Sequence, residues 1–258
     1  MSLAGEERRK RILEMLGIKG KVNVNELSQQ FEVTTETIRR DLDDLEKSNK
    51  LKKVYGGAVK LKTEIEPAYN EREIIHAEEK RAIGVLAAGL IEDNDVLVID
   101  EGSTAMQIIH HLKDKHNLTI LVCSIPTLTL LLDYQKNGEY DGRTIFIGGE
   151  VDPKHLRVSG PISEKMMEDF YVNKSFVSVD GVSLENGLTG YDYERALFTR
   201  KLMQCSQTTI VVADSSKIGK RTVARIADLS DVDYVVSNSE PPSGWTEKLQ
   251  DRGVTWLA

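Results

Sequence analysis

Apolar residues recur at helical spacing in three short segments at the start of the chain. The three groups are Ile12, Leu13 and Leu16; Leu27 and Phe31; and Ile38, Leu42 and Leu45. Thr34 stands just before the third segment, where threonine is a preferred helix N-cap. Val33 and Ile38 hold the two positions of a hydrophobic staple around it. The pattern predicts a helix-turn-helix, whose last helix enters the major groove of DNA.

A short hairpin is predicted after the third helix. Residues 51–55 and 58–61 alternate apolar and polar side chains, and Gly56-Gly57 is predicted to form the turn between them. A hairpin that follows a helix-turn-helix forms a wing, which lies beside the DNA backbone. The candidate phosphate contacts of this wing are Lys52, Lys53 and Tyr55.

The third predicted helix starts with groups suited to DNA and continues with acids. Arginine forms bidentate bonds with guanine or phosphate, while threonine hydroxyls and helix N-terminal N–H groups suit phosphate. The candidate DNA-binding residues here are Thr34, Thr35, Thr37, Arg39 and Arg40. The acids that follow are Asp41, Asp43, Asp44 and Glu46. We expect these acids to point away from DNA or to pair with Lys or Arg, which confines the contact to the helix start and the wing.

The charge distribution separates a basic module from an acidic one. The 258 residues carry a net charge of −7, but residues 1–62 hold 14 Lys/Arg and 10 Asp/Glu, a net +4. The remaining 196 residues hold 20 basic and 31 acidic side chains, a net −11. An acidic body repels DNA, so only the basic end is suited to approach it. For Arg39-Arg40 alone, a solvated helix with ordinary charge pairs is the alternative interpretation.

Downstream of residue 78, helical patterns alternate with β-branched runs. The predicted strands are 95–99, 118–122, 143–147, 174–179 and 208–213, and the helices between them are 78–91, 104–113, 126–136, 161–169 and 192–205. Short elements near 233–236, 244–252 and 254–257 complete the chain. This alternation predicts a mostly parallel α/β sheet. We therefore predict a winged helix-turn-helix domain at 1–62, a linker at 63–77, and an effector-sensing and oligomerisation domain at 78–258.

Polar loops follow four of the predicted strands. Ligands of parallel sheets bind at the carboxyl ends of strands, where glycine permits close approach and hydroxyls or helix N–H groups bind anions. The candidate effector-binding residues in or near these loops are Asp100, Gly102, Ser103, Thr104, Ser124, Gly149, Asp180, Gly181 and Lys217. Together they suit a small phosphorylated sugar or polyol. Each loop taken alone could be an ordinary turn or helix cap.

The stretch Thr37-Ile38-Arg39-Arg40-Asp41-Leu42, followed by Leu45 and Gly56-Gly57-Ala58, resembles the N-terminal motif of the DeoR family. This family of bacterial winged-helix repressors includes the glycerol-3-phosphate and deoxyribonucleoside repressors. Tyr55 stands where the family usually has histidine. The resemblance implies a repressor whose partners are a double-stranded DNA operator and a phosphorylated sugar, acting as a homo-oligomer, either a dimer or a tetramer.

The downstream loops extend this resemblance. Residues 100–104 (DEGST) resemble the family's D-x-G-T-T loop, and residues 214–220 (DSSKIGK) resemble its D-x-S-K-F-G motif. The resemblance implies a sugar-phosphate-sensing domain related to ribose-5-phosphate isomerase. The chain departs from the family at Val122-Cys123, where Thr-Asn is typical, and Asp192 or Glu194 replaces a family glutamate. These departures put the identity of the effector in doubt.

A sugar-phosphate isomerase with an accessory N-terminal domain is the alternative function. Isomerases of this type follow their Asp-Gly pair with Ala-Asp-Glu, whereas Asp180-Gly181 here is followed by Val-Ser-Leu. Aldose–ketose isomerisation needs a carboxylate base, and that position lacks one. We therefore expect a binding protein rather than an enzyme.

The sequence indicates neither a membrane segment nor a metal site. No apolar run approaches the roughly 18–20 residues that cross a bilayer. Cys123 and Cys205 lie far apart and are expected to be buried, reduced thiols. We therefore expect a cytoplasmic protein without cofactor or metal.

Overall fold

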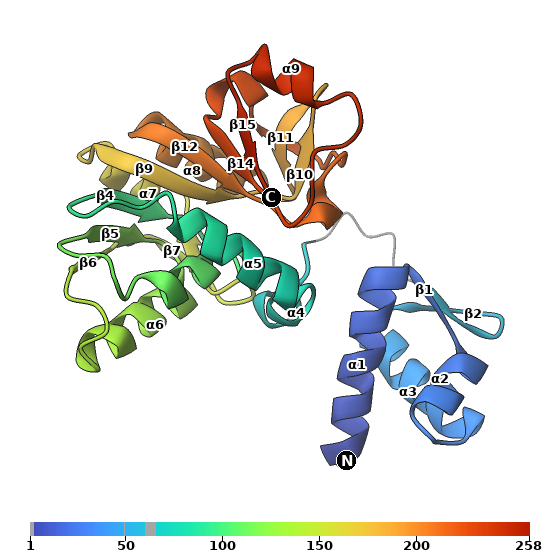
Figure 1. Cartoon of the computed structure of the whole chain (residues 1–258). Coiled ribbons are helices and arrows are strands. Elements are labelled where there is room, and N and C mark those ends of the chain that lie inside the picture. The colour runs from blue at the N-terminus through green and yellow to red at the C-terminus, as the bar shows by residue number, and fades with distance from the viewer. Residues whose placement is uncertain (1–2, 49, 60–65) are drawn as a thin grey trace. The chain divides into compact units, whose positions relative to one another are not determined.

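The structure is a computed structural model that describes residues 3–48, 50–59 and 66–258. The chain divides into two compact units, Met1–Thr63 and Glu64–Ala258, which are distinguished by colour in Figure 1. The predicted domain boundary at residues 62 and 63, and Lys60 and Leu61 of the predicted hairpin, lie outside the described residues.

The N-terminal unit is a winged helix-turn-helix, as the sequence predicts. Its elements are α1 (Leu3–Lys19), β1 (Lys21–Asn23), α2 (Val24–Gln30), α3 (Thr35–Lys47), β2 (Lys52–Val54) and β3 (Gly57–Val59). The three strands pair antiparallel in the order β1-β3-β2. The hairpin forms as expected, but β1 was not predicted because three residues are too few to show alternation.

The three predicted stripes meet in one core. Ile12, Leu27, Ile38 and Leu42 are completely buried, one or two from each helix. Thr34 is the N-cap of α3, and its Oγ1 accepts a hydrogen bond from the Thr37 N–H at 3.2 Å. Apolar spacing and capping therefore place α3 as the last helix of the helix-turn-helix.

The wing differs from the prediction at its turn. Tyr55-Gly56 forms the turn, with Gly56 at a φ of 78° that favours glycine, and Gly57 already belongs to β3. A Cβ added at Gly57 would lie 2.0 Å from the backbone oxygen of Val22 in β1. Gly57 is thus required by the close approach of two strands rather than by the turn.

The C-terminal unit is built on a seven-stranded, fully parallel sheet. Its strands, in spatial order, are β15 (Thr255–Leu257), β14 (Tyr234–Val236), β12 (Ser206–Val212), β9 (Val172–Ser178), β4 (Val96–Ile99), β5 (Thr119–Val122) and β6 (Arg143–Phe146). From β4 the chain adds β5 and β6 on one side, and β9 then returns to the other side. The crevice between β4 and β9 is therefore the topological switch point, where ligands of such sheets bind.

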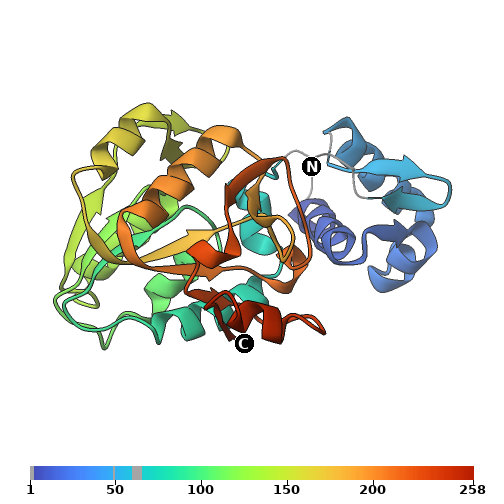
Figure 2. The same cartoon turned by 90° about the horizontal axis from the view of Figure 1, so that it is seen from above.

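Helices cover both faces of this sheet, as Figures 1 and 2 show. The larger helical elements are α5 (Ala77–Ala88), η1 (Ala105–His111), α6 (Ile125–Lys136), α7 (Pro161–Met167), α8 (Tyr193–Gln204) and α9 (Thr246–Gln250). Buried residues of α5, η1 and α6 share one apolar cluster, and those of α7 and α8 share the other. The predicted helix at 104–113 is a 3-10 helix, η1. Among the described residues, no helix combines the length and apolarity needed to cross a bilayer.

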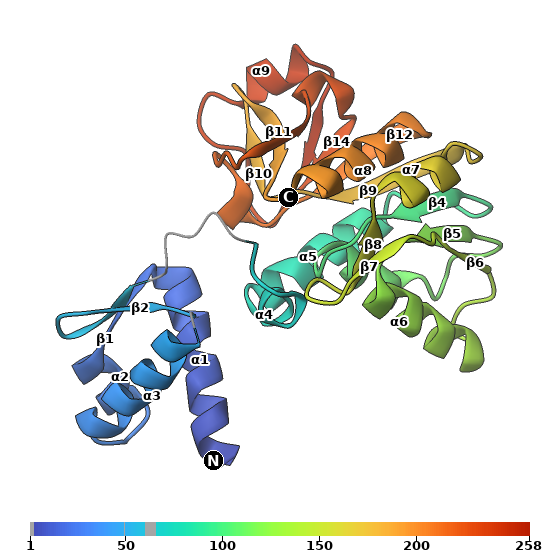
Figure 3. The same ribbon diagram turned by 180° about the vertical axis from the view of Figure 1, so that it is seen from behind.

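Several short elements were missed at the sequence level. They are α4 (Tyr69–Ile74), β7 (Glu150–Asp152), β8 (Arg157–Ser159), β10 (Gly181–Ser183), β11 (Gly187–Gly190), η2 (Ser215–Lys217), β13 (Ala224–Ala227) and η3 (Leu229–Asp231). The β7–β8 hairpin is visible from behind in Figure 3. Helix α4 lies within the segment 63–77 that was expected to be a linker, and Tyr69 is buried against the C-terminal unit, with its hydroxyl on Met106 Sδ.

We expect Gly57→Ala to destabilise the N-terminal unit, because its methyl group would overlap the Val22 carbonyl. Overpacking of this kind costs about 1–3 kcal/mol or more. Hydrogen–deuterium exchange should rise in β1 and α3, while β4 and β9 serve as an internal control in the same sample. Unchanged exchange in β1 would show that the two strands can separate at little cost.

Candidate functional site

The start of α3 presents an exposed basic surface. Arg39 and Arg40 are both exposed; Arg39 lies 3.7 Å from the carboxylate of Glu36, and Arg40 forms no ion pair with another described residue. Thr37 is half-buried, and its hydroxyl lies 2.9 Å from that of Thr34. Thr35 is also half-buried. The two arginines are therefore the most accessible donors of the predicted DNA-binding set on this helix.

The four acids that follow Arg40 on α3 form hydrogen bonds or ion pairs within the N-terminal unit. Asp41 is buried and accepts hydrogen bonds from Arg8 at 2.5 Å and from Arg9 at 3.3 Å, both on α1. Asp44 lies 3.4 Å from Arg9. The inward direction of Asp41 and the pairing of Asp44 remove two negative charges from the surface that α3 presents.

The remaining two acids bind the wing. Asp43 pairs with the Lys53 ammonium, and Glu46 accepts a hydrogen bond from the Lys53 N–H at 2.7 Å. Lys53 is therefore engaged by α3, unlike the exposed Lys52. Tyr55 at the turn is fully exposed. Of the three predicted wing contacts, Lys52 and Tyr55 are the ones presented to solvent.

In the C-terminal unit, Asp100 ties together the two strands of the switch point. It directly follows β4 and is completely buried. Its Oδ2 accepts hydrogen bonds from the Ser178 N–H and the Thr199 hydroxyl, each at 3.2 Å. Its Oδ1 accepts one from the Glu101 N–H at 2.8 Å. Burial raises the pKa of Asp100 to about 6. Asp100 thus has a structural role at the crevice, and its contact with an effector stays a prediction.

Two further predicted residues come together across β9 and β12. Asp180 follows β9, and its Oδ1 lies 3.4 Å from the ammonium of Lys217, which follows β12. The other oxygen of Asp180 accepts a hydrogen bond from Arg195 Nη1 at 3.0 Å. Burial opposes ionisation of Asp180, but Arg195 and Lys217 outweigh it and lower its pKa. Lys217 keeps a quarter of its side-chain surface exposed, so it lies at the solvent side of this group.

A buried charge cluster, which was missed at the sequence level, adjoins these residues. We call it the arginine cluster; it comprises Glu66, Arg72, Glu101, Arg157 and Arg195. Arg72 comes from α4, Arg157 from β8 and Arg195 from α8. Four of the five side chains are 4% exposed or less, and Arg72 is 12% exposed. Two helices and one strand thus bring three cations to one place beside the switch point.

Several other predicted effector residues have roles in the local structure of the chain. Ser124 caps α6, and its Oγ accepts a hydrogen bond from the Thr127 N–H at 3.3 Å. A Cβ on Gly149 would lie 2.0 Å from the Ser163 hydroxyl, and one on Gly102 would lie 2.6 Å from that of Ser178. Gly181 is equally tight against the Thr189 hydroxyl at 2.5 Å.

Ser103 and Thr104 follow Gly102 and are both buried, at the start of η1. Among the described residues, side-chain contacts of Asp100 join the loop after β4 to the residues at the ends of β5 and β9, and Lys217 joins the loop after β12 to Asp180.

The departures from the family pattern also have structural roles. Cys123 is completely buried with its thiol 3.8 Å from Asp100, and burial raises its pKa well above the usual range. Asp192 caps α8 by accepting a hydrogen bond from the Arg195 N–H at 2.7 Å. Glu194 is exposed. Asp192 therefore acts on the arginine cluster only indirectly, by fixing the start of the helix that carries Arg195.

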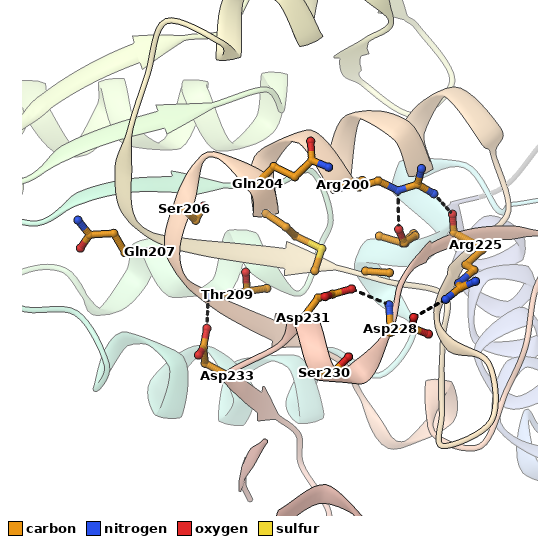
Figure 4. A pocket seen from close by; sticks show the side chains of 13 residues that line it. Arg200, Gln204, Ser206, Gln207, Thr209, Arg225, Asp228, Ser230, Asp231 and Asp233 are labelled. Carbon is orange, nitrogen blue, oxygen red and sulfur yellow. Dashed lines mark hydrogen bonds and ion pairs between the residues drawn. The ribbon is translucent and has the colours of Figure 1, made fainter. Parts of the chain in front are cut away.

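A large cavity lies away from the switch point. It measures about 690 Å³ and is shown in Figure 4. It lies beside the first residues of β12, the opposite end of that strand from Lys217. Two of its charged side chains pair with each other, since Arg225 binds Asp228, and the Asp228 N–H donates to Asp231. Ligands of parallel sheets bind at the carboxyl ends of strands. We therefore place the candidate site at the switch point.

The charges of the arginine cluster shift the pKa values of Glu101 and of the neighbouring His155. Burial opposes ionisation of Glu101, but the attraction of Arg72, Arg195 and Arg157 outweighs it and lowers the pKa of Glu101. Burial, and then repulsion by Arg157, lower the pKa of the neighbouring His155 to about 4. His155 lies 3.7 Å from Glu66. The site therefore holds a neutral histidine at neutral pH, and its cations are the arginines and Lys217.

Comparisons with known proteins match both units. A DeoR-like helix-turn-helix domain matches residues 8–64, and a DeoR C terminal sensor domain matches residues 75–239. The chain is 35% identical over 249 residues to the uncharacterized HTH-type transcriptional regulator YulB of Bacillus subtilis, covering 96% of this chain and 94% of the relative. It is 26% identical to the glycerol-3-phosphate regulon repressor of Escherichia coli, covering 96% of each chain.

Among solved structures, ribose 5-phosphate isomerase A from Methanocaldococcus jannaschii resembles this chain with a TM-score of 0.39 and 15% identity, over 55% of each chain.

We expect His155 to contribute to the stability of the C-terminal unit at neutral pH, and this contribution to be lost as the pH drops from about 6.5 to about 4. His155 stays neutral in the folded state over this window, whereas an unfolded histidine takes up a proton, so the unfolded state gains. In His155→Gln this contribution disappears, and the difference between the two proteins should change by at most about 1.4 kcal/mol per pH unit. Denaturant titrations at several pH values measure it. Parallel pH profiles for wild type and variant would contradict the assignment.

Proposed function

Because the chain belongs to the DeoR family of transcriptional regulators, we propose that it is a sequence-specific DNA-binding repressor of a sugar or polyol catabolic operon. A phosphorylated sugar binds at the carboxyl ends of the sheet strands and controls it. The observation that carries the effector part is the meeting of Asp180, Lys217 and three arginines at the switch point. The regulon named for the Escherichia coli relative supports the same ligand class.

The DNA-binding part rests on the exposed start of α3. Arg39 and Arg40 are accessible, while the four acids that follow them on the same helix are bound by α1 and the wing. Arginines in this position of a recognition helix suit guanine or phosphate. Two or more copies of the chain then occupy repeated half-sites, so we propose a cytoplasmic homo-oligomer. Effector binding favours an arrangement that no longer matches the operator spacing, by a coupling of typically ~1–3 kcal/mol.

We propose binding without catalysis. An isomerase needs a carboxylate free to act as base. Asp180 is instead held by Arg195 and Lys217, and the residues after Gly181 carry no carboxylate before Glu185. Incubation with ribose 5-phosphate tests this directly. Formation of the ketose at a rate proportional to protein concentration would contradict binding without catalysis and support the isomerase function.

Arg39→Ala and Arg40→Ala should each weaken operator binding by about 1–3 kcal/mol, because each removes a charged donor from the groove-facing start of α3. DNA is first selected from a random pool with the wild-type protein, and affinities are then compared by gel shift at one salt concentration. Lys47→Ala is the matched control, since Lys47 is an exposed cation in the last turn of the same helix. Equal losses for all three variants would move the recognition surface elsewhere.

Lys217→Ala should leave the affinity for the selected DNA unchanged but weaken its release by effector, since Lys217 lies at the solvent side of the candidate site. A thermal-shift screen of phosphorylated sugars and polyols first identifies a ligand; a real one stabilises by ~2.7 kcal/mol at a hundredfold excess over Kd. Lys220→Ala is the control, because Lys220 is exposed in the same loop. If the two variants respond to the ligand alike, Lys217 does not bind it.

A further inference from the structure

Glu101 is held by all three guanidinium groups of the arginine cluster. Its Oε1 accepts a hydrogen bond from Arg157 Nη1 at 2.9 Å and pairs with Arg195 Nε, and its Oε2 accepts one from Arg72 Nη2 at 3.1 Å. The three arginines belong to three elements far apart in sequence. They converge on a single carboxylate, which stands in the loop between β4 and η1 that opens the switch-point crevice.

The cluster retains donor capacity that Glu101 does not use. Arg157 is 3% exposed, yet its Nε has no hydrogen-bond partner, and the same is true of Arg72 Nε and of the Ser178 hydroxyl. Buried donors are nearly always hydrogen-bonded, so each exception calls for an explanation. A carboxylate offers two oxygens and one negative charge. A phosphate monoester offers three terminal oxygens and a charge of about −1.5 to −2 at neutral pH.

We propose that Arg72, Arg157 and Arg195 form the receptor for the phosphate group of the effector, and that Glu101 occupies this receptor when effector is absent. This inference rests on the proposed function, which supplies the phosphorylated sugar as the natural ligand. Planar guanidinium groups match the oxygens of phosphate as they match those of a carboxylate. Effector phosphate replaces the Glu101 carboxylate, and Lys217 and Arg72, the more exposed cations of the site, lie where the ligand enters.

This exchange acts on the segment that leads to the DNA-binding unit. Arg72 also binds Glu66 at 2.9 Å, and Glu66 stands three residues after Thr63, where the N-terminal unit ends. Arg157 binds the same Glu66 at 3.0 Å. Both arginines are therefore shared between Glu101 and Glu66. A phosphate that binds these arginines weakens their bonds to Glu66 and so loosens α4. Ile75, the residue after α4, is held by a separate contact, because its carbonyl accepts a hydrogen bond from the Lys80 ammonium at 2.6 Å.

A purely structural ion cluster and a ligand receptor predict different effects of removing the Glu101 charge. If the arginines only brace the fold, removal of the Glu101 charge destabilises the unit and no external anion replaces it specifically. If Glu101 is an internal competitor, its removal opens the receptor. Apparent ligand affinity is reduced by the fraction of protein that is not competent to bind, and a variant that removes the competitor recovers this loss.

The test compares Glu101→Gln with wild type, using inorganic phosphate as the probe and calorimetric titration of the full chain. Glu101→Gln should bind phosphate roughly tenfold tighter than wild type or better, and phosphate should raise its melting temperature more than sodium chloride does at equal ionic strength. The matched control is Asp95→Asn. Asp95 is a buried carboxylate paired with Lys174 at 2.6 Å, at the opposite end of the same strand β4. Its loss should leave phosphate affinity at the wild-type value.

Phosphate binding to Glu101→Gln that is no tighter than to wild type overturns the inference, as does an equal gain in Asp95→Asn. Should Glu101→Gln fail to fold, hydrogen–deuterium exchange on the wild-type chain decides. Phosphate should accelerate exchange in α4 relative to α6, and unchanged or slower exchange in α4 overturns the inference.

The outcome is separable from that of the proposed function. A phosphorylated sugar that releases DNA from both proteins with equal affinity leaves the repressor intact and refutes the role of Glu101. Tight phosphate binding by Glu101→Gln without any DNA binding by wild type refutes the repressor and keeps the receptor.

Discussion

The buried carboxylate of Asp100 is the constraint on which the candidate site depends. At the switch point the chain leaves β4 and β9 in opposite directions, so the loops that follow them have no ladder to hold them together. Asp100 replaces that ladder by accepting bonds from Ser178 after β9 and from Thr199 in α8. The close approach of Gly102 to Ser178 belongs to the same arrangement. Glu101, the next residue, meets the three arginines beside this fixed carboxylate.

The composition of the arginine cluster favours recognition over stability. Buried ion pairs gain little net stability over well-packed apolar residues, because their desolvation offsets most of the Coulomb attraction. A unit selected for stability alone has no need to bury three guanidinium groups. The arginines lie at the carboxyl ends of the strands, where parallel sheets bind ligands, so ligand binding explains why the desolvation cost is tolerated. Arg157 Nε is left without a partner, as a donor waiting for a larger anion would be.

The sequence predicted the sheet, the helix-turn-helix and three of the loops that meet at the site, because apolar periodicity and strand-end composition are local properties. It did not predict the arginine cluster, whose members come from short or helical segments and meet only through tertiary packing. A signal was nevertheless present. Arg195 shares a helical face with Thr199 and Leu202, and Asp41 lies three residues after Ile38 and four before Leu45. A charge inside an apolar stripe indicates a buried, paired group, and both residues are buried and paired. Ser124 caps a helix and Gly149 lies in close contact with Ser163, so both positions have a local structural reason for their residue type, and their effector role stays a prediction.

The acids of α3 have consequences for how DNA is bound. Asp41 joins α3 to α1, and Asp43 with Glu46 joins it to the wing, so helix and wing are held in one orientation by charges that would otherwise repel phosphate. The same contacts engage Lys53, so Lys52 is the exposed lysine of the described part of the wing. Each phosphate neutralised adds a slope of about −0.9 in the dependence of log affinity on log salt, so a unit with few such contacts binds DNA weakly and with a shallow salt dependence. Useful affinity then requires linked units that engage half-sites together. In the proposed homo-oligomer, an effector that changes the spacing between units therefore acts on DNA binding without altering any residue of α3.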